Sequence, residues 1–583
     1  MNILQRHGIA ALPLAMSIAL TGCVDNDYDL SKDIDMNITV GGNITIPSSS
    51  TDNYTMKQIL DLDENGNSCI QPIGDQFGLA AGDYVLVQDG NKTPSTYSIS
   101  RISITDIKAN GNSASLSFPV GQTSATVNNL TNVIELNDDN VDKQILSIDE
   151  ARTNFELKFR LSATSTSSSY TGSAVIAKGF RIAFPKQWVM ENRTTGGYTT
   201  LGNDNVLTFT QDRTIPAGGA LDLVLHISAF DLTKAAAGQG LYEPGHFKFD
   251  SEIVSNGQVR ISGSSNSAVN MRVTATPIIP TITVTGLTGK VDPNISMSSS
   301  YFPIEGIPGF LHDQNNVFDF YNPCIYFTIN NTCPAAVSLN AVFVANYHDG
   351  KPSKTIRVGD LYGTSKVMIP AGTTSTICLS RLGQNGKTGA INVAVPQLSE
   401  LFMSLPSSIE VTDIKAKIPT DKSITFELGQ NYSFDVDYQL VVPLSFGENA
   451  RFTYFTDDKD WDEDLEDYNF NQAIATLTIE NTSPVRLVPE INALDRNGNI
   501  MTDVTATVEG FVAGGSVSAP ATSELKITLK STARNLNELN GVAFLFNATN
   551  DGSHVGVPFN VAQYIKFSDI VLKIIGGIDI DLN

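Results

Sequence analysis

The stretch 322–343, NPCIYFTINNTCPAAVSLNAVF, consists of two apolar segments joined by a short polar turn. In the first segment apolar residues recur at every second position, which is typical of a half-buried β-strand. The turn INNTCP contains Asn, Thr and Pro, residues that reverse a chain or keep a strand from continuing. The stretch therefore predicts two β-strands joined by a tight turn.

The same alternation recurs along most of the chain. It is interrupted by Gly, Asn, Asp and Pro, including the hairpin dipeptides Asp349-Gly350 and Asn497-Gly498. Helical spacing is confined to two short segments, 54–62 and 396–405. We therefore expect an all-β protein built from tandem antiparallel β-sandwich modules with a few short helices. The clearest alternating segments are YVLVQ (84–88), FELKFRLSA (155–163), LDLVLHISAF (221–230), ATLTIE (475–480), LKITLK (525–530) and IVLKII (570–575).

Internal repeats indicate how many modules there are. The turn INNTCP (329–334) returns as IENTSP (479–484), and a Pro-Ala pair precedes an alternating segment at Pro216, Pro370 and Pro520. The three prolines are 154 and 150 residues apart. Each interval has the length of a domain, so the repeat predicts the same turn in three modules. The expected organisation is a leader (1–22), an acidic tether with a first strand (23–50), an N-terminal β region (51–150) and modules at 151–285, 286–445 and 446–583.

The opening stretch also carries a resemblance to a known family. NPCIYFTINNTCPAAVSLNAVF, and more faintly IATLTIENTSPVRLVPEINAL, resembles the sandwich domain of late-embryogenesis-abundant (water-stress) proteins. The resemblance covers about thirty residues of each module. It implies a sandwich, either of this kind or immunoglobulin-like, and no particular function.

The N-terminus predicts where in the cell the protein is located. MNILQRHGIAALPLAMSIALTGC places Arg6 and His7 before a short apolar run, the pattern of a secretory signal. Its end, Leu-Thr-Gly-Cys, resembles the lipobox of bacterial lipoproteins, which implies that Cys23 becomes the first mature residue and carries a diacylglyceryl group and acyl chains. Each buried acyl methylene contributes about 0.8 kcal/mol to membrane binding. A plain secretory signal with a chance cysteine is the alternative.

The residues after the cysteine are acidic. Asp25, Asp27 and Asp29 resemble the export tag of surface-exposed lipoproteins of the Bacteroidota. The resemblance implies display on the outer face of the outer membrane. The alternative is an ordinary solvated tether, which would leave the protein on the periplasmic face.

Composition excludes some partners. The chain has 38 Lys and Arg against 61 Asp and Glu, a net charge of −23, and no basic stripe. Such a chain repels phosphate backbones, so we expect no nucleic-acid partner. The four cysteines after Cys23 show no metal-ligand spacing and are expected to be buried apolar residues. They are Cys69, Cys324, Cys333 and Cys378.

Two weak candidate sites remain. The acidic run DDKDWDEDLED (457–467) could hold Ca²⁺ loosely, although a solvated loop is the simpler interpretation. Trp461 in this run and Trp188 are the only tryptophans, and an exposed one could stack on a glycan. The weak metal candidates are Asp457, Asp458, Asp460 and Asp462. Beyond the lipid on Cys23 we expect no cofactor.

We expect no catalytic activity, because the six histidines are scattered and no nucleophile motif occurs. Cys23, the following aspartates and the β modules resemble Bacteroidota cell-surface lipoproteins, which include fimbrillin-type adhesins and glycan-capture lipoproteins. This implies adhesion or ligand capture. A pilus-shaft role is disfavoured, because such fimbrillins are cleaved after an N-terminal Arg and none lies between Cys23 and Arg101.

Three alternatives stay open. A glycan-binding accessory of a nutrient uptake complex predicts exposed aromatic residues. An envelope carrier of an apolar ligand predicts an apolar cavity inside a module. An enzyme would need convergent acids or a nucleophile–base pair that spacing does not reveal.

Overall fold

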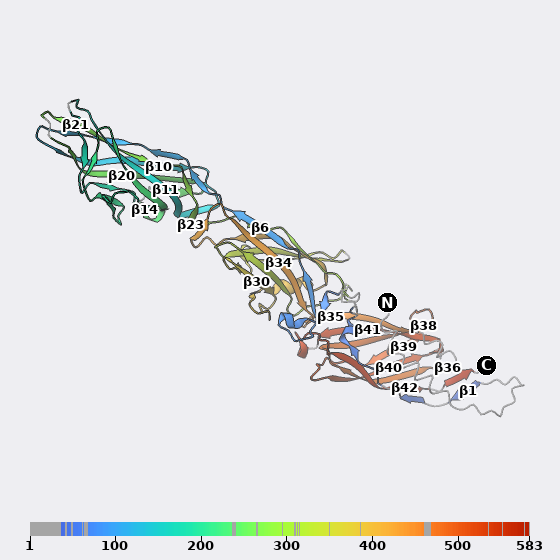
Figure 1. The fold of residues 1–583 in the computed structure, drawn as a ribbon. Helices are drawn as coiled ribbons and strands as arrows, with labels where there is room; N and C mark the ends of the chain where they lie inside the picture. Colours follow the sequence, from blue (N-terminus) through green and yellow to red (C-terminus); the bar gives the residue numbers. More distant parts are fainter. Residues whose placement is uncertain are drawn as a thin grey trace.

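The computed structural model places the strands in three modules arranged end to end along one rod (Figure 1). It describes residues 37–581 apart from a set of gaps. The gaps are 41–43, 48–49, 61, 63–67, 169, 236–240, 264–265, 294, 308–310, 312, 314, 349, 385, 460–467, 534–535, 551 and 576–577.

The distal module is a sandwich of two large sheets, with a small sheet of β7 (Ile102–Ile104) and β22 (Ile282–Val284) beside them. One large sheet contains β8 (Asp106–Ala109), β10 (Ser124–Asp138), β12 (Ala174–Ile176), β13 (Arg181–Ala183), β15 (Thr199–Leu201), β16 (Val206–Phe209), β17 (Arg213–Ile215), β19 (Leu241–Glu243) and β20 (His246–Ile261). The other contains β9 (Asn112–Phe118), β11 (Ile145–Ser165), β14 (Trp188–Asn192), β18 (Ala220–Asp231), β21 (Val269–Ile278), β23 (Gly286–Val291) and β33 (Ile424–Glu427).

The middle module is a second sandwich. One sheet contains β24 (Ile295–Ser296), β25 (Ser300–Pro303), β27 (Val337–Tyr347), β28 (Lys354–Val358), β29 (Val367–Ile369) and β32 (Pro406–Lys417). The other contains β4 (Ile70–Gln71), β5 (Val85–Asp89), β6 (Thr93–Ser98), β26 (Cys324–Asn331), β30 (Thr373–Ser380), β31 (Ile391–Ala394) and β34 (Asn431–Pro443).

The C-terminal module has three sheets. The largest contains β2 (Ile44–Pro47), β3 (Tyr54–Thr55), β37 (Gln472–Asn481), β39 (Val504–Glu509), β40 (Ala521–Ser531) and β42 (Tyr564–Ile575). The second contains β35 (Arg451–Lys459), β38 (Val485–Asp495) and β41 (Leu539–Asn550), and the third contains β1 (Asn37–Val40), β36 (Tyr468–Asn469) and β43 (Ile578–Asp581). These sandwiches confirm the predicted all-β, multi-module fold.

Two short helices lie in the segments for which the sequence predicts helical structure. In α2 (Met56–Ile59), the backbone N–H of Thr55 donates to Oε1 of Gln58 at 2.9 Å and caps the first turn. The segment after Pro396 forms η6 (Pro396–Phe402), a 3₁₀ helix with Leu398, Leu401 and Phe402 buried. The remaining short helices are η2 (Gly74–Phe77), η3 (Leu232–Lys234), η5 (Asp360–Tyr362), η7 (Leu536–Glu538) and η8 (Gly552–His554).

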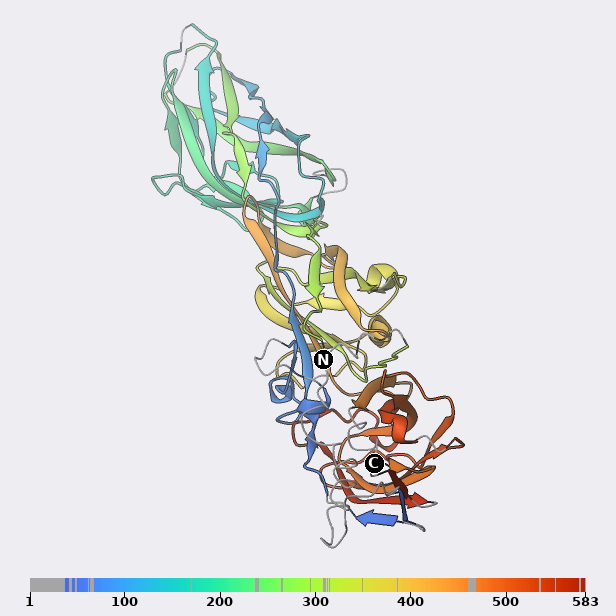
Figure 2. The ribbon, with the colours of Figure 1, turned by 90° about the vertical axis from the view of Figure 1, so that its right-hand side faces the viewer.

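The modules are nested in the sequence. The chain begins with β1–β3 in the C-terminal module, passes through the middle module as β4–β6, and builds most of the distal module as β7–β23. It then returns through the middle module and ends where it began. Figure 2 shows the N-terminal segment (blue) running along the middle module towards the distal one.

This nesting changes the expected division of the chain. Residues 51–150, expected as a separate N-terminal region, contribute strands to all three modules, and the expected boundary at 150/151 falls inside β11. The boundaries at 285/286 and 445/446 fall between β22 and β23 and between β34 and β35. The difference arises because alternation marks a strand without indicating its partner.

The repeated turn is held by a buried asparagine. In the middle module Asn331, which is 0% exposed, donates from Nδ2 to the carbonyls of Ala335 (3.1 Å) and Pro370 (2.7 Å), and its Oδ1 accepts from the N–H of Cys333 (2.9 Å). These bonds tie the strand end to the turn that leads from β29 in one sheet to β30 in the other.

The C-terminal module repeats the arrangement with Asn481. Its Nδ2 donates to the carbonyls of Val485 and Ala513, both at 2.9 Å, and its Oδ1 accepts from the N–H of Ser483. Ala513, rather than Pro520, therefore occupies the position of Pro370. Pro520 follows a small extra bridge between Ser516 and Ala519, so the third Pro-Ala pair matches the others in sequence but not in position.

A cluster of phenylalanines joins the middle and C-terminal modules. The rings of Phe320 and Phe446 are 5.4 Å apart, and Phe446 lies within 5.4 Å of both Phe452 and Phe559. All belong to, or pack against, one buried apolar cluster that continues through the distal module. The rod therefore has a continuous core across this junction.

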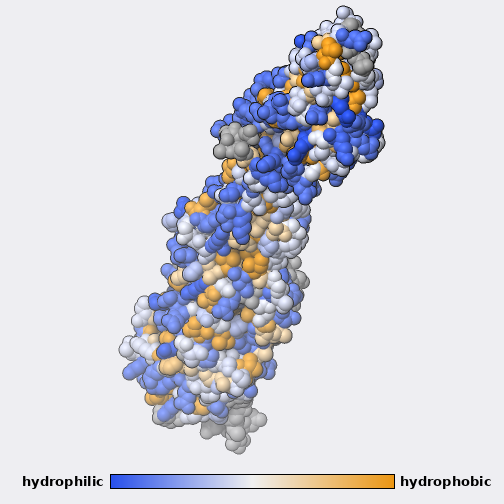
Figure 3. Space-filling model, turned by 90° about the vertical axis from the view of Figure 1, so that its left-hand side faces the viewer, coloured by the Kyte–Doolittle hydropathy of each residue, from blue (hydrophilic) through white to orange (hydrophobic). Residues whose placement is uncertain are grey.

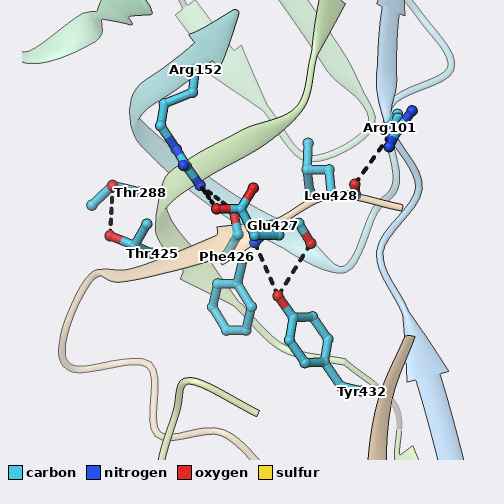
Figure 4. A network of polar contacts seen from close by, with 8 residues as sticks. All are labelled: Arg101, Arg152, Thr288, Thr425, Phe426, Glu427, Leu428 and Tyr432. Carbon is cyan, nitrogen blue, oxygen red and sulfur yellow. Dashed lines mark hydrogen bonds and ion pairs between the residues drawn. The ribbon is translucent and has the colours of Figure 1, made fainter. Parts of the chain in front are cut away.

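Strand β33 joins the distal and middle modules (Figure 4). It comes from the returning chain and pairs with β23 at the edge of the distal sheet. Arg152 of β11 forms an ion pair with Glu427 and donates to the carbonyl of Phe426. The hydroxyl of Tyr432 in β34 accepts from the N–H of Glu427 and donates to its carbonyl. Arg101 donates to the carbonyl of Leu428 on the other side.

Candidate functional site

Several sequence-predicted residues lie outside the described part of the chain. These are Cys23, Asp25, Asp27, Asp29, Asp460, Trp461 and Asp462. Asp458 belongs to β35, and nothing is described of its side chain. Asp457, also in β35, is paired with the ammonium of Lys459 at 2.5 Å and its side chain is 16% exposed. Because Lys459 already neutralises this carboxylate, Asp457 is a poor ligand for Ca²⁺.

The structure corrects the prediction for Trp188. This residue is 2% exposed, lies opposite Phe230 across β14 and β18, and has its ring centroid 6.2 Å from that of Phe230. A ring enclosed in the sandwich core cannot stack on a glycan. The sequence could not show this, because tryptophan is found both in cores and in binding sites.

The four cysteines after Cys23 are buried, as predicted, and none of these described residues forms a disulfide. Burial raises the pKa of the Cys69 thiol to about 11, which keeps it protonated and unreactive. Among the described residues, no three His, Cys, Asp or Glu side chains are grouped so that they could hold a metal ion. Within the same part of the chain, no helix has the length and apolar character needed to cross a membrane.

A polar groove of about 370 Å³ lies on the outer face of the distal module, over β8, β10 and β20. The strand registers place its side chains in two rows across the sheet. One row is Lys108, Glu135 and Asp250; the next is Asp106, Asn137 and Lys248. The alternate residues point inward, so Leu136 and Phe249 are fully buried.

Opposite charges are held in place within this polar groove. Lys108 donates to Glu135 at 2.9 Å, and this hydrogen bond lowers the pKa of Glu135 and raises that of Lys108. Lys248 lies 3.1 Å from Oδ2 of Asp250, whose buried Oδ1 forms no hydrogen bond in the described structure. His246 bonds to Asp139 at one end. The groove therefore presents fixed charges of both signs, with four carboxylates against two lysines.

The face of the distal module seen in Figure 3 is polar as well. In the space-filling view of Figure 3, the distal module is nearest the viewer and is dominated by hydrophilic residues, with scattered hydrophobic ones. Among the residues lining the polar groove, His246 carries the one aromatic ring. The site can therefore form hydrogen bonds and ion pairs with a ligand, but it offers little surface for ring stacking.

A second concave site of opposite character lies inside the C-terminal module. An apolar pocket of about 160 Å³ opens between the sheet containing β37 and β42 and the sheet containing β35 and β41, with α2 as one wall. Its sixteen lining residues are apolar or aromatic except for Ser483. Neither site is recognisable in the sequence, since each depends on strands that are distant in the chain.

Comparisons with known proteins give little more. No family model and no curated protein matches the sequence. Among solved structures, the chain is similar to a protein of Parabacteroides distasonis described as a candidate secreted protein. The likeness covers 49% of this chain and 83% of that one, at 15% sequence identity and a TM-score of 0.37. A likeness at this level carries no information about a ligand or an activity.

Proposed function

We propose that the protein is a non-catalytic lipoprotein of the cell envelope that is anchored through Cys23 and captures a polar partner with its distal module, as an adhesin does. The observation that supports this is the place where the chain enters the rod. β1 pairs with β43, and β2 and β3 pair with β42. The anchored end of the chain therefore joins the C-terminal module.

The length of the segment between Cys23 and the first strand limits how far the C-terminal module can lie from the membrane. Thirteen residues lie between Cys23 and Asn37, the first residue of β1, and this tether reaches at most about 50 Å when fully extended. The distal module lies at the other end of the rod (Figure 1). A rod held at its C-terminal module would present the distal module farthest from the membrane, where a partner meets it first.

The polar groove suggests the chemistry of the partner. Fixed rows of opposite charge are complementary to a polar protein surface with its own charge pattern, and they give specificity more than raw affinity. A glycan-binding accessory is the alternative, since carboxylates and amides also bind sugar hydroxyl groups. It has less support, because Trp188 is buried and the groove has few rings.

The volume of the apolar pocket argues against the alternative of an envelope carrier for an apolar ligand. An engineered cavity of about 150 Å³ holds one benzene molecule. The apolar pocket of the C-terminal module, at about 160 Å³, is therefore too small for the acyl chains of an envelope lipid.

Display is tested on intact cells. We expect external protease to remove the distal module from cells that express the full chain, and Cys23→Ala to release the protein from the membrane fraction. Resistance to protease on intact cells, with cleavage after lysis, would place the protein on the inner face instead.

Binding is tested with the mature chain against host or bacterial surface proteins and against a glycan array. We expect Lys108→Glu together with Lys248→Glu to weaken binding by about tenfold or more, because each row of the groove loses its one positive charge and then carries only negative charges. Lys92→Glu is the matched control: Lys92 is an exposed lysine of the middle module, paired with Asp437. Equal binding by both variants would contradict the assignment, and glycan binding alone would favour the accessory role.

A further inference from the structure

The apolar pocket of the C-terminal module opens beside the edge of a sheet. Its lining comes from β35, β38 and β41 on one side and from β3, α2 and β42 on the other. Tyr454 of β35 and Phe546 of β41 are half-buried, and so are Tyr54 and Phe567 on the facing wall. Because β35 is the edge strand of its sheet, the mouth of the pocket lies along this edge.

The edge of β35 has backbone groups that point away from its partner strand β41. The N–H and the carbonyl of Arg451 both bond to Val317, each at 2.7 Å, on the side away from β41. Backbone direction alternates along an antiparallel strand, so the N–H and the carbonyl of Phe455 point the same way. Among the described residues, no strand pairs with β35 on this side at Phe455. Such an edge is a template for another strand.

The chain already adds a short extended segment to this edge. Val317 pairs antiparallel with Arg451, at the start of β35. The next residue, Phe318, is 2% exposed, and its ring stacks on that of Phe452 with centroids 6.4 Å apart. A valine at the edge followed by a phenylalanine turned into the core is therefore an arrangement that this edge accepts.

The added segment stops before Phe455. The N–H of Thr453 donates to Oδ1 of Asn316 at 2.9 Å, and the edge is open after that point. Phe455 is 63% exposed on the outer face of β35, whereas Tyr454 points inward and lines the pocket. A strand that continued the same pattern would set one side chain over Phe455 and the next side chain beside Tyr454.

The pocket limits which side chain can enter it. A cavity of about 150 Å³ accommodates a single benzene ring, and this pocket measures about 160 Å³. Its lining is apolar or aromatic apart from Ser483, so the side chain that enters must be apolar. The main-chain groups of the added strand would bond to β35, which leaves no polar group unpaired within the lining.

We propose that the C-terminal module binds an extended apolar segment of a partner protein, which adds as an antiparallel strand to the edge of β35 at Phe455. Two successive apolar residues carry the recognition: the first covers Phe455 and the second fills the apolar pocket. This site is separate from the polar groove of the distal module and does not depend on the capture function proposed above.

The test uses the fluorescently labelled peptide Lys-Thr-Thr-Val-Phe-Thr and measures its anisotropy with the intact mature chain. We expect saturable binding at one site. A peptide with alanine in place of phenylalanine should bind about tenfold more weakly or worse, because the pocket loses the phenyl ring. A peptide with proline in place of valine should not bind, since proline cannot donate to the carbonyl of Phe455.

Variants of the protein test the same contacts. Phe455→Thr should weaken binding several-fold, because the cross-strand apolar contact is lost. Phe455→Pro should abolish binding while its pairing with β41 is kept, since the N–H that it removes points away from β41. Val488→Thr is the matched control: Val488 is a 36% exposed residue of β38, at the other side of the same sheet, and the variant should bind like the native protein.

Thermal melts show whether each variant folds, and the proline peptide with native protein decides the question if Phe455→Pro does not. Absence of binding by the valine–phenylalanine peptide would overturn the proposal. Equal affinity for the valine and proline peptides, or equal losses in Phe455→Thr and Val488→Thr, would overturn it as well.

Discussion

Asn331 and Asn481 explain why the sequence repeats at all. Each side chain supplies two donors and one acceptor, and each uses all three inside a turn that water does not reach. No other side chain of that length offers the same set. The repeat therefore preserves a structural joint between two sheets, not a binding site.

Loss of this side-chain amide should lower the stability of the folded protein. Asn481→Ala leaves an N–H and two carbonyls unpaired in the core, and each unsatisfied group costs about 1–3 kcal/mol. We expect the free energy of unfolding to fall by roughly 3 kcal/mol or more in urea titrations. Asn330→Ala is the control, because Asn330 is half-buried and accepts one bond from Thr374. Equal effects in the two variants would contradict the role of the buried amide.

A second prediction for single residues concerns the stability of the protein at acid pH. Arg160 and Asp222 face each other across β11 and β18, and the hydrogen bond from Arg160 lowers the pKa of Asp222. A carboxyl with a lowered folded-state pKa stabilises the protein above its unfolded pKa, near 3.9, and loses that contribution as pH falls through the folded value.

The variant Asp222→Asn should therefore be less stable than the native protein at neutral pH, and the two should converge as pH falls through the lowered pKa of Asp222. The difference should not exceed about 1 kcal/mol, because the side chain is 36% exposed. Thermal melts across pH measure it. Asp204→Asn, whose carboxylate lies 3.9 Å from Arg181 and is 60% exposed, is the control. A difference between native protein and Asp222→Asn that does not change with pH would count against this account.

At the scale of elements, a second repeat has a physical explanation. VTDIKAK (411–417) and FSDIVLK (567–573) recur because Asp413 and Asp569 have positive φ angles of 47° and 50° at irregularities in β32 and β42. Aspartate tolerates this conformation better than most residues. The sequence showed the repeat, but the bulge became visible only in the strand registers.

Strand β33 is the element on which the distal junction depends. It is short, and Arg152 holds it from the side through Glu427 and the carbonyl of Phe426. We expect Arg152→Ala to speed amide exchange in 424–427 by about tenfold, because a charged hydrogen-bond donor is lost. Arg193→Ala is the control, since its ion contacts are at 3.8–3.9 Å on the surface. Unchanged exchange in 424–427 would show that pairing with β23 suffices.

The whole molecule should behave as a stiff rod. One apolar cluster runs from the distal module to Phe446 and Phe559, so both junctions are packed and not linked by free chain. Spin labels at Thr126 in β10 and Val488 in β38 should give a distance distribution as narrow as the pair Val488 and Thr507 within one module. The four described thiols, Cys69, Cys324, Cys333 and Cys378, are buried and would not interfere. A broad or double distribution would indicate a hinge.

Some features could be predicted from residues alone. Alternation identified the strands, the spacing after Pro396 identified a short helix, and the two Asn-Thr turns marked equivalent points of two modules. The distal counterpart was missed, because Ser165-Thr166-Ser167 stands there without an asparagine, although the N–H of Thr166 bonds to Asn270 as that of Thr332 does to Ser433.

The sequence by itself determined the class of fold, and it predicts the lipid-anchored address at Cys23, because alternation and the lipobox are local patterns. Only the tertiary structure decided which strands are partners. A strand alternates in the same way whichever neighbour it pairs with, so nothing local showed that β1–β3 close the last module. For the same reason the polar groove, built from Lys108, Glu135 and Asp250, and the apolar pocket around Ser483 exist only once distant strands have come into register.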